Sequence, residues 1–174
     1  MSAAPGRAAD AAAPDAPRIS GYEPGALGRV VELHGRWYAR HWKFGAYFEA
    51  LVAQGLAEFL GNFDAARDGF WIARLGETVA GSVSLVGARD AGPARLRWFI
   101  LDEGAQGRGI GRRLMQAAMD FSRAAGYRHV YLTTFAGLDA ARALYEKHGF
   151  VLTHEAADRT WGVPVTEQRF DWHA

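Results

Sequence analysis

The stretch WFILDEGAQGRGIGRRLM, from Trp98 to Met115, joins an apolar run typical of a β-strand to an apolar run typical of an α-helix. Glycines and arginines are crowded between these two runs. Arg108, Arg112 and Arg113 fall at the start of the predicted helix, where the helix dipole already places partial positive charge. Further cations at this end cost stability unless an anion offsets them. The stretch therefore predicts an anionic ligand at the loop.

The run Gln106–Gly111 has the composition of a phosphate-binding loop. Its glycines let the backbone approach a ligand closely, and the free amides of a first helical turn bind phosphate oxygens. Two nucleotide motifs are excluded by the spacing. A Walker A loop needs Gly-Lys-Ser/Thr, and a dinucleotide fingerprint needs a glycine where this chain has Arg112. A tight turn with solvated arginines remains the alternative.

Length and composition predict one domain with an ordinary core. The chain has 174 residues and a net charge of +1, which gives no reason to expect a nucleic-acid or membrane partner. It has no cysteine, so disulfides, thiolate metal sites and cysteine nucleophiles are excluded. The histidines outside the predicted first helix are scattered without ligand spacing, and we expect no metal.

The opening residues, MSAAPGRAADAAAPDAP, are rich in Ala, Pro and Asp and predict a disordered leader over 1–17. This leader lacks the basic and the continuous apolar regions of a secretory signal. No apolar run approaches the roughly 20 residues that span a bilayer. We therefore expect a cytoplasmic protein whose single domain covers 18–174.

From Arg18 onward, strand-like and helix-like patterns alternate, as they do in α+β and α/β layered domains. The predicted strands are 18–22, 69–75, 78–88, 95–101, 129–135, 151–155 and 165–172. The predicted helices are 26–41, 46–60, 111–125 and a last one, in LDAARALYEKHGF, that Gly149 ends. The last two strands are expected to close the sheet as an antiparallel pair.

The pattern Q-x-x-G-x-G between a strand and a helix, followed by a strand and a helix ending in ALYEKHGF, resembles the GNAT superfamily of acyl-CoA-dependent N-acyltransferases. The order of elements from Arg18 to Trp172 is similar as well. The segments ELHGRWYARHWKFGAYFEALVAQGLAEFL and FWIARLGETVAGSVSLV resemble the acetyltransferase domains that are fused to MarR-type regulators. The resemblance implies an α+β, GNAT-like fold: a mixed, mostly antiparallel central sheet with helices on both faces and a splayed strand pair.

The resemblance also implies acetyl-CoA as the acyl donor. The positions that match the family's pyrophosphate-binding loop are Gln106, Gly107, Arg108, Gly109, Ile110, Gly111 and Arg112. Ile100 and Leu101, at the end of the preceding strand, are expected to pair with the pantetheine amides like an added strand. The thioester would then lie in a slot between the strands RLRWFIL and HVYLTTF.

Acyl transfer to an amine needs a neutral nucleophile, stabilisation of an oxyanion and a proton for the leaving thiolate. The resemblance implies that Tyr145 supplies the proton and that the backbone N–H of Leu101 faces the oxyanion. A core tyrosine bonded to the backbone is the alternative for Tyr145. Two positions depart from the family's pattern: Leu138 replaces an asparagine, and RLRWFIL contains no glutamate base. Deprotonation would then occur through water, or the substrate would bind already neutral, and a side-chain base is left open among Glu32, His34 and His41.

For the acceptor, the resemblance implies a primary amine on a small molecule, such as an amino acid or an analogue. His34 and Tyr38 lie one helical turn apart and, with Trp98, are the candidates for binding it. A histidine satisfied within a packing face is the alternative. The aromatic residues Trp37, Trp42, Phe44 and Tyr47 either line an acceptor pocket or belong to the core.

Two further expectations concern partners. The tail VTEQRFDWHA is a candidate for pairing between two copies of the chain in a homodimer. The competing functional hypothesis is a non-catalytic module that binds acyl-CoA as a sensor and acts through a protein partner. The missing strand glutamate and Leu138 keep this hypothesis open.

Overall fold

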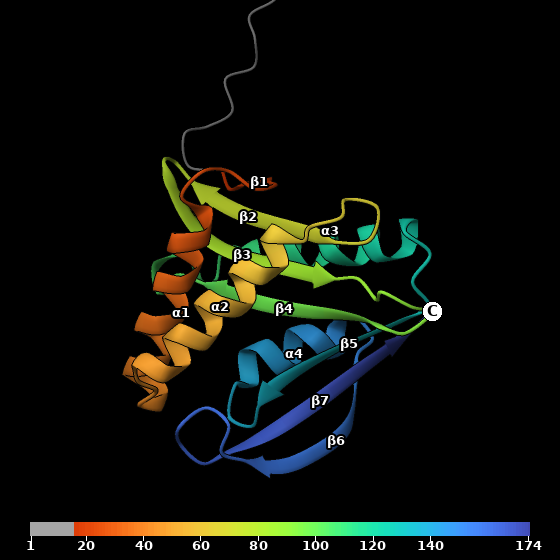
Figure 1. Ribbon diagram of the computed structural model, residues 1–174. Coiled ribbons are helices and arrows are strands. Elements are labelled where there is room, and N and C mark those ends of the chain that lie inside the picture. Colours follow the sequence, from red (N-terminus) through yellow and green to blue (C-terminus); the bar gives the residue numbers. More distant parts are fainter. Residues whose placement is uncertain (1–15) are drawn as a thin grey trace, which may run out of the picture.

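The computed structural model describes residues 16–174 (Figure 1). Positions 1–15, most of the predicted leader, lie outside the described residues. The strands are β1 Arg18–Ser20, β2 Gly69–Leu75, β3 Thr78–Val86, β4 Ala94–Leu101, β5 His129–Phe135, β6 Val151–Asp158 and β7 Val165–His173. The helices are α1 Ala26–Trp42, α2 Ala46–Gly61, α3 Ile110–Ala124 and α4 Asp139–Lys147, with a short 3-10 turn η1 at Glu103–Ala105. The predicted bounds of β2 and β5 are confirmed, and the other elements differ from prediction only at their ends.

The described residues form one sheet of seven strands in the order β1-β2-β3-β4-β5-β7-β6. Only β4 and β5 pair in parallel, and the other neighbours are antiparallel. Helices α1 and α2 cover one face of the sheet, while α3 and α4 lie on the other (Figure 1). The predicted α+β fold, with a mostly antiparallel central sheet and helices on both faces, is confirmed.

Two clusters of buried side chains divide the core between the faces of the sheet. The α3-side core includes Leu114, Met119 and Phe170, all fully buried. The α1-side core includes Val30 and Leu56, which are likewise fully buried. These residues recur at the helical and strand periods of their elements, so each element buries one apolar face. Each such side chain contributes about 1.5–3 kcal/mol of hydrophobic stabilisation.

The contact between β4 and β5 is short. Only two pairs are in register, Ala94 with Val130 and Arg95 with Tyr131, and beyond them the strands part. A bulge bends β4 at the same place, because its register with β3 shifts between Ser82 and Ser84. The predicted splay between RLRWFIL and HVYLTTF is therefore present.

Strand β7 lies between β5 and β6 and pairs antiparallel with both (Figure 1). The expected closing pair of strands is confirmed. Because both edges of β7 are occupied within the chain, its backbone is not open to pairing with a second copy. The exposed edge of the sheet at this end is β6 instead.

Candidate functional site

A cavity of about 300 Å³ lies where β4 and β5 separate. Its lining comes from both cores, so the cavity reaches through the sheet at the splay. On the α3 side it is lined by Leu96, Phe99, Met115, Leu132 and Tyr145. On the α1 side it is lined by His34, Tyr38, Phe48, Trp98, Phe135 and Trp161. Sequence analysis singled out His34, Tyr38, Trp98 and Tyr145, and the structure brings these four together around one cavity.

Tyr145, on α4, is buried against aromatic rings on the α3 side. Its ring lies 6.0 Å from that of Phe99 and 6.1 Å from that of Phe170. No group of residues 16–174 is hydrogen-bonded to the Tyr145 hydroxyl. The alternative for this residue, a core tyrosine whose hydroxyl bonds to the backbone, is therefore not the arrangement in the structure. Burial, and then the nearby Tyr38 phenol, raise the pKa of Tyr145, so the phenol stays protonated at neutral pH.

His34 and Tyr38 lie on one face of α1 with their rings stacked 6.3 Å apart. His34 Nδ1 donates to the carbonyl of Val30 at 2.8 Å, which leaves Nε2 as the nitrogen with the lone pair. Burial lowers the pKa of His34 to about 4. A histidine with so low a pKa is neutral at physiological pH and is a weak proton acceptor.

Trp98 lies at the bulge in β4 and has a left-handed backbone, with φ of 49°. The Ser82 hydroxyl donates to the Trp98 carbonyl at 2.9 Å and holds the bulge to β3. The Trp98 ring is buried on the α1 side, 5.4 Å from the ring of Phe59. The sequence makes Trp98 a candidate for binding the acceptor, and its ring both joins the α1-side core and lines the cavity.

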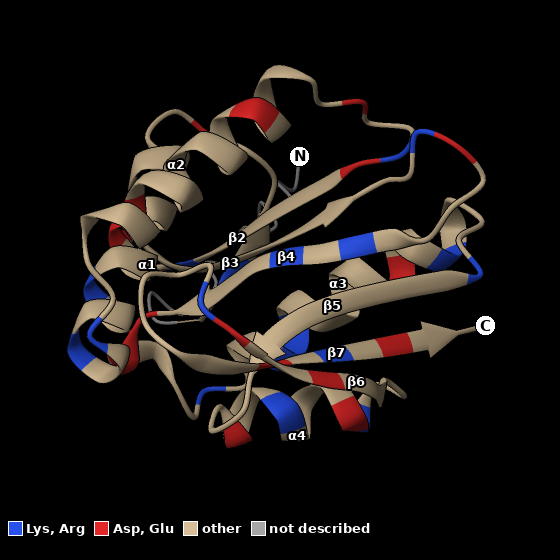
Figure 2. Ribbon diagram, turned by 60° about the horizontal axis from the view of Figure 1, so that its bottom comes forward, with Lys and Arg blue, Asp and Glu red and all other residues tan. Residues whose placement is uncertain are grey.

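Two arginines of β4, Arg95 and Arg97, also line the cavity, and sequence analysis did not single them out. Figure 2 shows blue bands, which mark Lys and Arg, along β4. Alternate residues of a strand share a face. Two arginines at alternate positions of a central strand therefore indicated, in the sequence itself, that one face of this strand carries charge. Burial lowers the pKa of Arg97 to about 10.

The loop before α3 has the backbone that a phosphate-binding loop requires. Gly107 and Gly109 have φ of 75° and 73°, a region that side chains disfavour. Helix α3 begins at Ile110 with no side-chain cap and no acidic residue in its first turn, so its first amides are not used within the helix. Arg108 and Arg112 are exposed beside these amides.

Two further residues at the start of α3, Arg113 and Gly111, have roles in the packing of the domain. Arg113 donates to the carbonyl of Pro17 at the base of β1. A Cβ on Gly111 would lie 3.2 Å from Leu101 Cδ1 and 3.3 Å from Phe99 Cζ, so this glycine permits α3 to pack closely on β4. The anionic-ligand prediction thus concerns Arg108 and Arg112 more directly than Arg113.

The backbone at the end of β4 alternates in direction. Asp102 N–H donates to the carbonyl of Ala80 on β3, so the next position, Leu101, directs its backbone groups toward the open edge of β4. Ile100, paired with Ser82, directs its backbone at β3. We expected the backbones of both residues to face an added strand. The register with β3 leaves only the backbone groups of Leu101 free for such pairing, because those of Ile100 already face β3.

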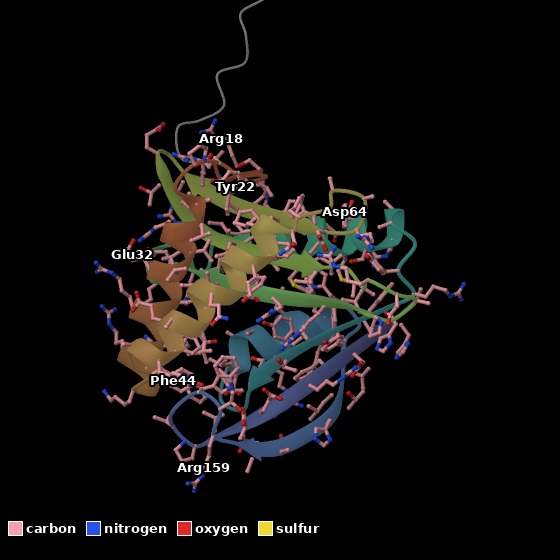
Figure 3. The ribbon with its side chains drawn as sticks, in the orientation of Figure 1. Arg18, Tyr22, Glu32, Phe44, Asp64 and Arg159 are labelled. Atoms are coloured by element: carbon pink, nitrogen blue, oxygen red, sulfur yellow. The ribbon has the colours of Figure 1, made fainter. Side chains whose placement is uncertain are left out.

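The other base candidates, Glu32 and His41, do not border the cavity. Glu32 forms ion pairs with Arg29 and Arg36, both at 2.9 Å, and Figure 3 shows it on the outer side of α1. The Arg29 hydrogen bond lowers the pKa of Glu32 further. His41 Nε2 lies 2.6 Å from Glu103. These groups stabilise the surface beside η1.

The aromatic cluster at the α1–α2 junction is mostly core. Phe44 is buried and packs on Phe135, whereas Tyr47 is 59% exposed. None of Trp37, Trp42, Phe44 and Tyr47 lines the cavity. The aromatic wall comes instead from Phe48 on α2, Phe135 on β5 and Trp161 in the β6–β7 loop.

The described part of the chain contains neither a cluster of metal-ligating side chains nor a membrane-spanning helix. No group of three or more His, Asp or Glu side chains in 16–174 is arranged to hold a metal ion. Among the helices of these same residues, none has the length and apolar character to cross a membrane.

Comparisons with known proteins identify relatives of this chain. Two relatives with curated descriptions are N-acetyltransferase 8 of Rattus norvegicus, 28% identical over 137 residues, and mycothiol acetyltransferase of Beutenbergia cavernae, 41% identical over 75 residues. These matches cover 75% and 43% of this chain. They span 62% of the rat protein and 25% of the bacterial one, so the chain corresponds to only part of each.

Solved structures with the same fold cover 91% of this chain. An acetyltransferase of Streptococcus agalactiae superimposes with a TM-score of 0.72 at 22% identity, over 98% of its own length. The yncA protein of Salmonella typhimurium, solved with acetyl-CoA as its cofactor, gives a TM-score of 0.72 at 15% identity, over 94% of its length. At these identities the likeness establishes the fold.

The sequence profile of the Acetyltransferase (GNAT) family matches residues 29–150. This range includes most of α1, both strands of the splay, the glycine loop and Tyr145. The chain belongs to the GNAT family of acetyltransferases.

Proposed function

We propose that this chain transfers an acetyl group from acetyl-CoA to the primary amine of a small molecule, such as an amino acid or an analogue. The observation that carries the proposal is the cavity through the splay, with the Tyr145 hydroxyl, to which no group of residues 16–174 is hydrogen-bonded, on its α3 side. A donor and an acceptor can meet there from opposite faces of the sheet. Membership of the GNAT family supports the same chemistry.

The glycine loop fits the phosphate groups of the donor. The proposed pyrophosphate-binding residues are Gln106, Gly107, Arg108, Gly109, Ile110, Gly111 and Arg112. Free amides at the start of α3 and two exposed arginines favour an anion, and no acidic side chain of the first turn opposes it. The backbone of Leu101, at the open edge of β4, would pair with the pantetheine arm.

Two groups of the chain, the backbone N–H of Leu101 and the phenol of Tyr145, would act on the reacting atoms. The N–H of Leu101 stabilises the developing oxyanion. Tyr145, whose raised pKa keeps it protonated, gives its proton to the departing thiolate. His34 is a weak base because of its pKa of about 4, so the amine binds neutral or loses its proton through water. His34, Tyr38 and Trp98 contact the acceptor.

The proposal extends to the setting of the enzyme. On the likeness of its α1–α2 and hairpin sequences, we place the chain beside the acetyltransferase domains that are fused to MarR-type regulators. Residues 18–174 would form a single N-acetyltransferase domain. We expect it to act in the cytoplasm.

Calorimetric titration with acetyl-CoA and CoA tests the donor site first. The wild type is compared with a variant in which Gly109 and Gly111 are both replaced by valine, and urea unfolding checks that this variant is folded, because valine at Gly111 also crowds Leu101 and Phe99. Gly28→Ala is the matched control, since a Cβ at Gly28 meets no atom within 4 Å. Binding that only the double variant loses would support the proposed loop. An amine panel followed by thiol release then tests transfer, and absence of donor binding to the wild type would overturn the proposal.

A non-catalytic acyl-CoA sensor is the second candidate. The observation in its favour is that no Asp or Glu of the described residues lines the cavity to act as a base. Leu138, the N-cap residue before α4, makes no side-chain cap and also lacks the amide of the family's pattern. A sensor would bind acetyl-CoA normally and release no thiol with any amine.

A further inference from the structure

Arg95 and Arg97 enter the cavity from the α1 side of the sheet. Arg97 lies over the Trp98 ring, with its guanidinium carbon 4.1 Å from the ring centroid. It also passes α2 closely, because a Cβ on Gly55 would lie 3.4 Å from Arg97 Nη2. Arg95 reaches across the splay and donates from Nη2 to Thr133 Oγ1 at 2.8 Å. Both guanidinium groups are thus held in place by neutral neighbours.

Neither arginine has a carboxylate partner within the described residues. The arginines that do form ion pairs there are Arg29, Arg36, Arg40, Arg67, Arg74, Arg123, Arg142 and Arg169. Glu58 and Glu167 are near enough to influence the cavity arginines electrostatically but do not pair with them. In addition, the Nε–H of Arg95 is buried without an acceptor.

Two cations at one cavity without an anion are costly, since each is partly removed from water and each repels the other. The lowered pKa of Arg97 reflects this cost, with burial as the main cause and Arg95 as the next. A protein retains such a pair at a binding site when a ligand supplies the missing charge. The planar guanidinium matches a carboxylate, which accepts two parallel hydrogen bonds from it.

We propose that the acetyl acceptor is an amine that also carries a carboxylate, and that Arg95 and Arg97 bind this carboxylate. The inference rests on the proposed function and names the chemistry of its acceptor. Its apolar body would lie against the aromatic wall formed by Phe48, Phe135 and Trp161. The amine would then point toward Tyr145 across the sheet.

The phosphates of the donor are not the anion in question. Leu101 follows Arg97 by four residues, which separates them by about 13 Å along a strand. The glycine loop follows later in the sequence, after η1. Leu101 also packs toward Gly111 on the α3 side, whereas Arg97 packs toward α2. The two arginine sites therefore serve different anions.

Matched amines with and without a carboxylate test the inference by thiol release. The pairs are phenylalanine with phenethylamine, leucine with isoamylamine, and methionine with 3-(methylthio)propylamine. The wild type is expected to prefer the acid of a pair. Arg97→Gln is expected to lower kcat/KM for that acid by about tenfold or more, the loss of a charged hydrogen bond, and to lower it much less for the decarboxylated amine. Arg97→Lys restores part of the loss.

Arg36→Gln is the control, because Arg36 is an exposed arginine of α1, outside the cavity. Arg95→Gln, in which the second proposed carboxylate ligand is replaced, is tested with the same pairs of amines. Calorimetric binding of acetyl-CoA shows that each variant is folded. Preference for the decarboxylated amines, or an equal loss on both members of a pair, would overturn the inference while transfer itself stands.

If no amine releases thiol, the proposed function fails and binding decides the inference separately. The same pairs are then titrated calorimetrically in the presence of CoA. Binding of an acid that Arg97→Gln abolishes would support the carboxylate site. Binding of no acid would overturn it.

Discussion

The Ser82 hydroxyl donates a hydrogen bond of 2.9 Å to the carbonyl of Trp98, across the bulge that bends β4 away from β5. Trp98 has a positive φ, which costs about 1–3 kcal/mol for a residue with a side chain. The bond therefore holds a strained backbone in place. The splay, and with it the cavity, depends on this contact between neighbouring strands.

Replacing Ser82 and its neighbour Ser84 should have different effects. Ser82→Ala removes the bond to Trp98 and should lower the free energy of unfolding by about 1 kcal/mol. Ser84 Oγ is buried without a partner among the described residues, so Ser84→Ala should leave this free energy unchanged or raise it by up to about 1 kcal/mol. Urea unfolding of both variants measures the difference, and equal destabilisation by the two would contradict the role of Ser82.

Tyr145→Phe tests the proton donor. The variant should bind acetyl-CoA like the wild type but show a kcat lower by about 100-fold, because the leaving thiolate loses its acid. Tyr47→Phe is the control, since Tyr47 is 59% exposed and outside the cavity. Steady-state kinetics on the best amine of the panel give both values. An unchanged kcat in Tyr145→Phe would assign the proton to another group.

His34 should make the protein less stable as pH falls from 6.5 toward 4. Its pKa is lowered from 6.5 to about 4 in the folded state, so in this window the unfolded chain binds a proton and the folded one does not. The free energy of unfolding should then fall by up to about 1.4 kcal/mol per pH unit. Urea unfolding at several pH values should show this slope in the wild type and its loss in His34→Gln. The same slope in both proteins would contradict the burial of a neutral imidazole.

Asp171 should stabilise the β5–β7–β6 part of the sheet. Its buried carboxylate accepts from Arg169 at 2.7 Å and from His129 at 2.6 Å, and the Arg169 bond lowers its pKa. Asp171→Asn should lower the free energy of unfolding by about 2 kcal/mol at neutral pH. Because the folded pKa is lowered, this contribution is present above the unfolded pKa near 3.8 and is lost as pH falls below it. Asp120→Asn, at an exposed ion pair, is the control, and an equal effect of the two would contradict the assignment.

The sequence predicted the elements well because their periodicity is local. The strand 69–75 has β-branched and aromatic residues between glycine-containing turns, and its bounds are those of β2. The splay was expected from the family resemblance alone. Its physical cause, the bulge at Trp98, depends on a hydrogen bond between two strands that no local pattern reveals.

The site was predicted only in part. The glycine loop and Tyr145 were found by motif, whereas Arg95 and Arg97 were missed because an arginine in a strand usually faces solvent. Glu32 was offered as a base, but its side chain points to Arg29 and Arg36 on the outer side of α1. The direction of one residue on a helix depends on tertiary packing, and composition does not determine it.

The placement of β7 has a consequence for how the chain is assembled during synthesis. Strand β6 is made before β7, yet its partner in the finished sheet is β7, which inserts between β5 and β6. Until the ribosome has released residues 165–173, both β5 and β6 expose unpaired edges that invite aggregation. We therefore expect the half of the molecule that bears Tyr145 and Phe135 to fold after the β1–β4 half, and a chain stalled before β7 to be more prone to aggregation.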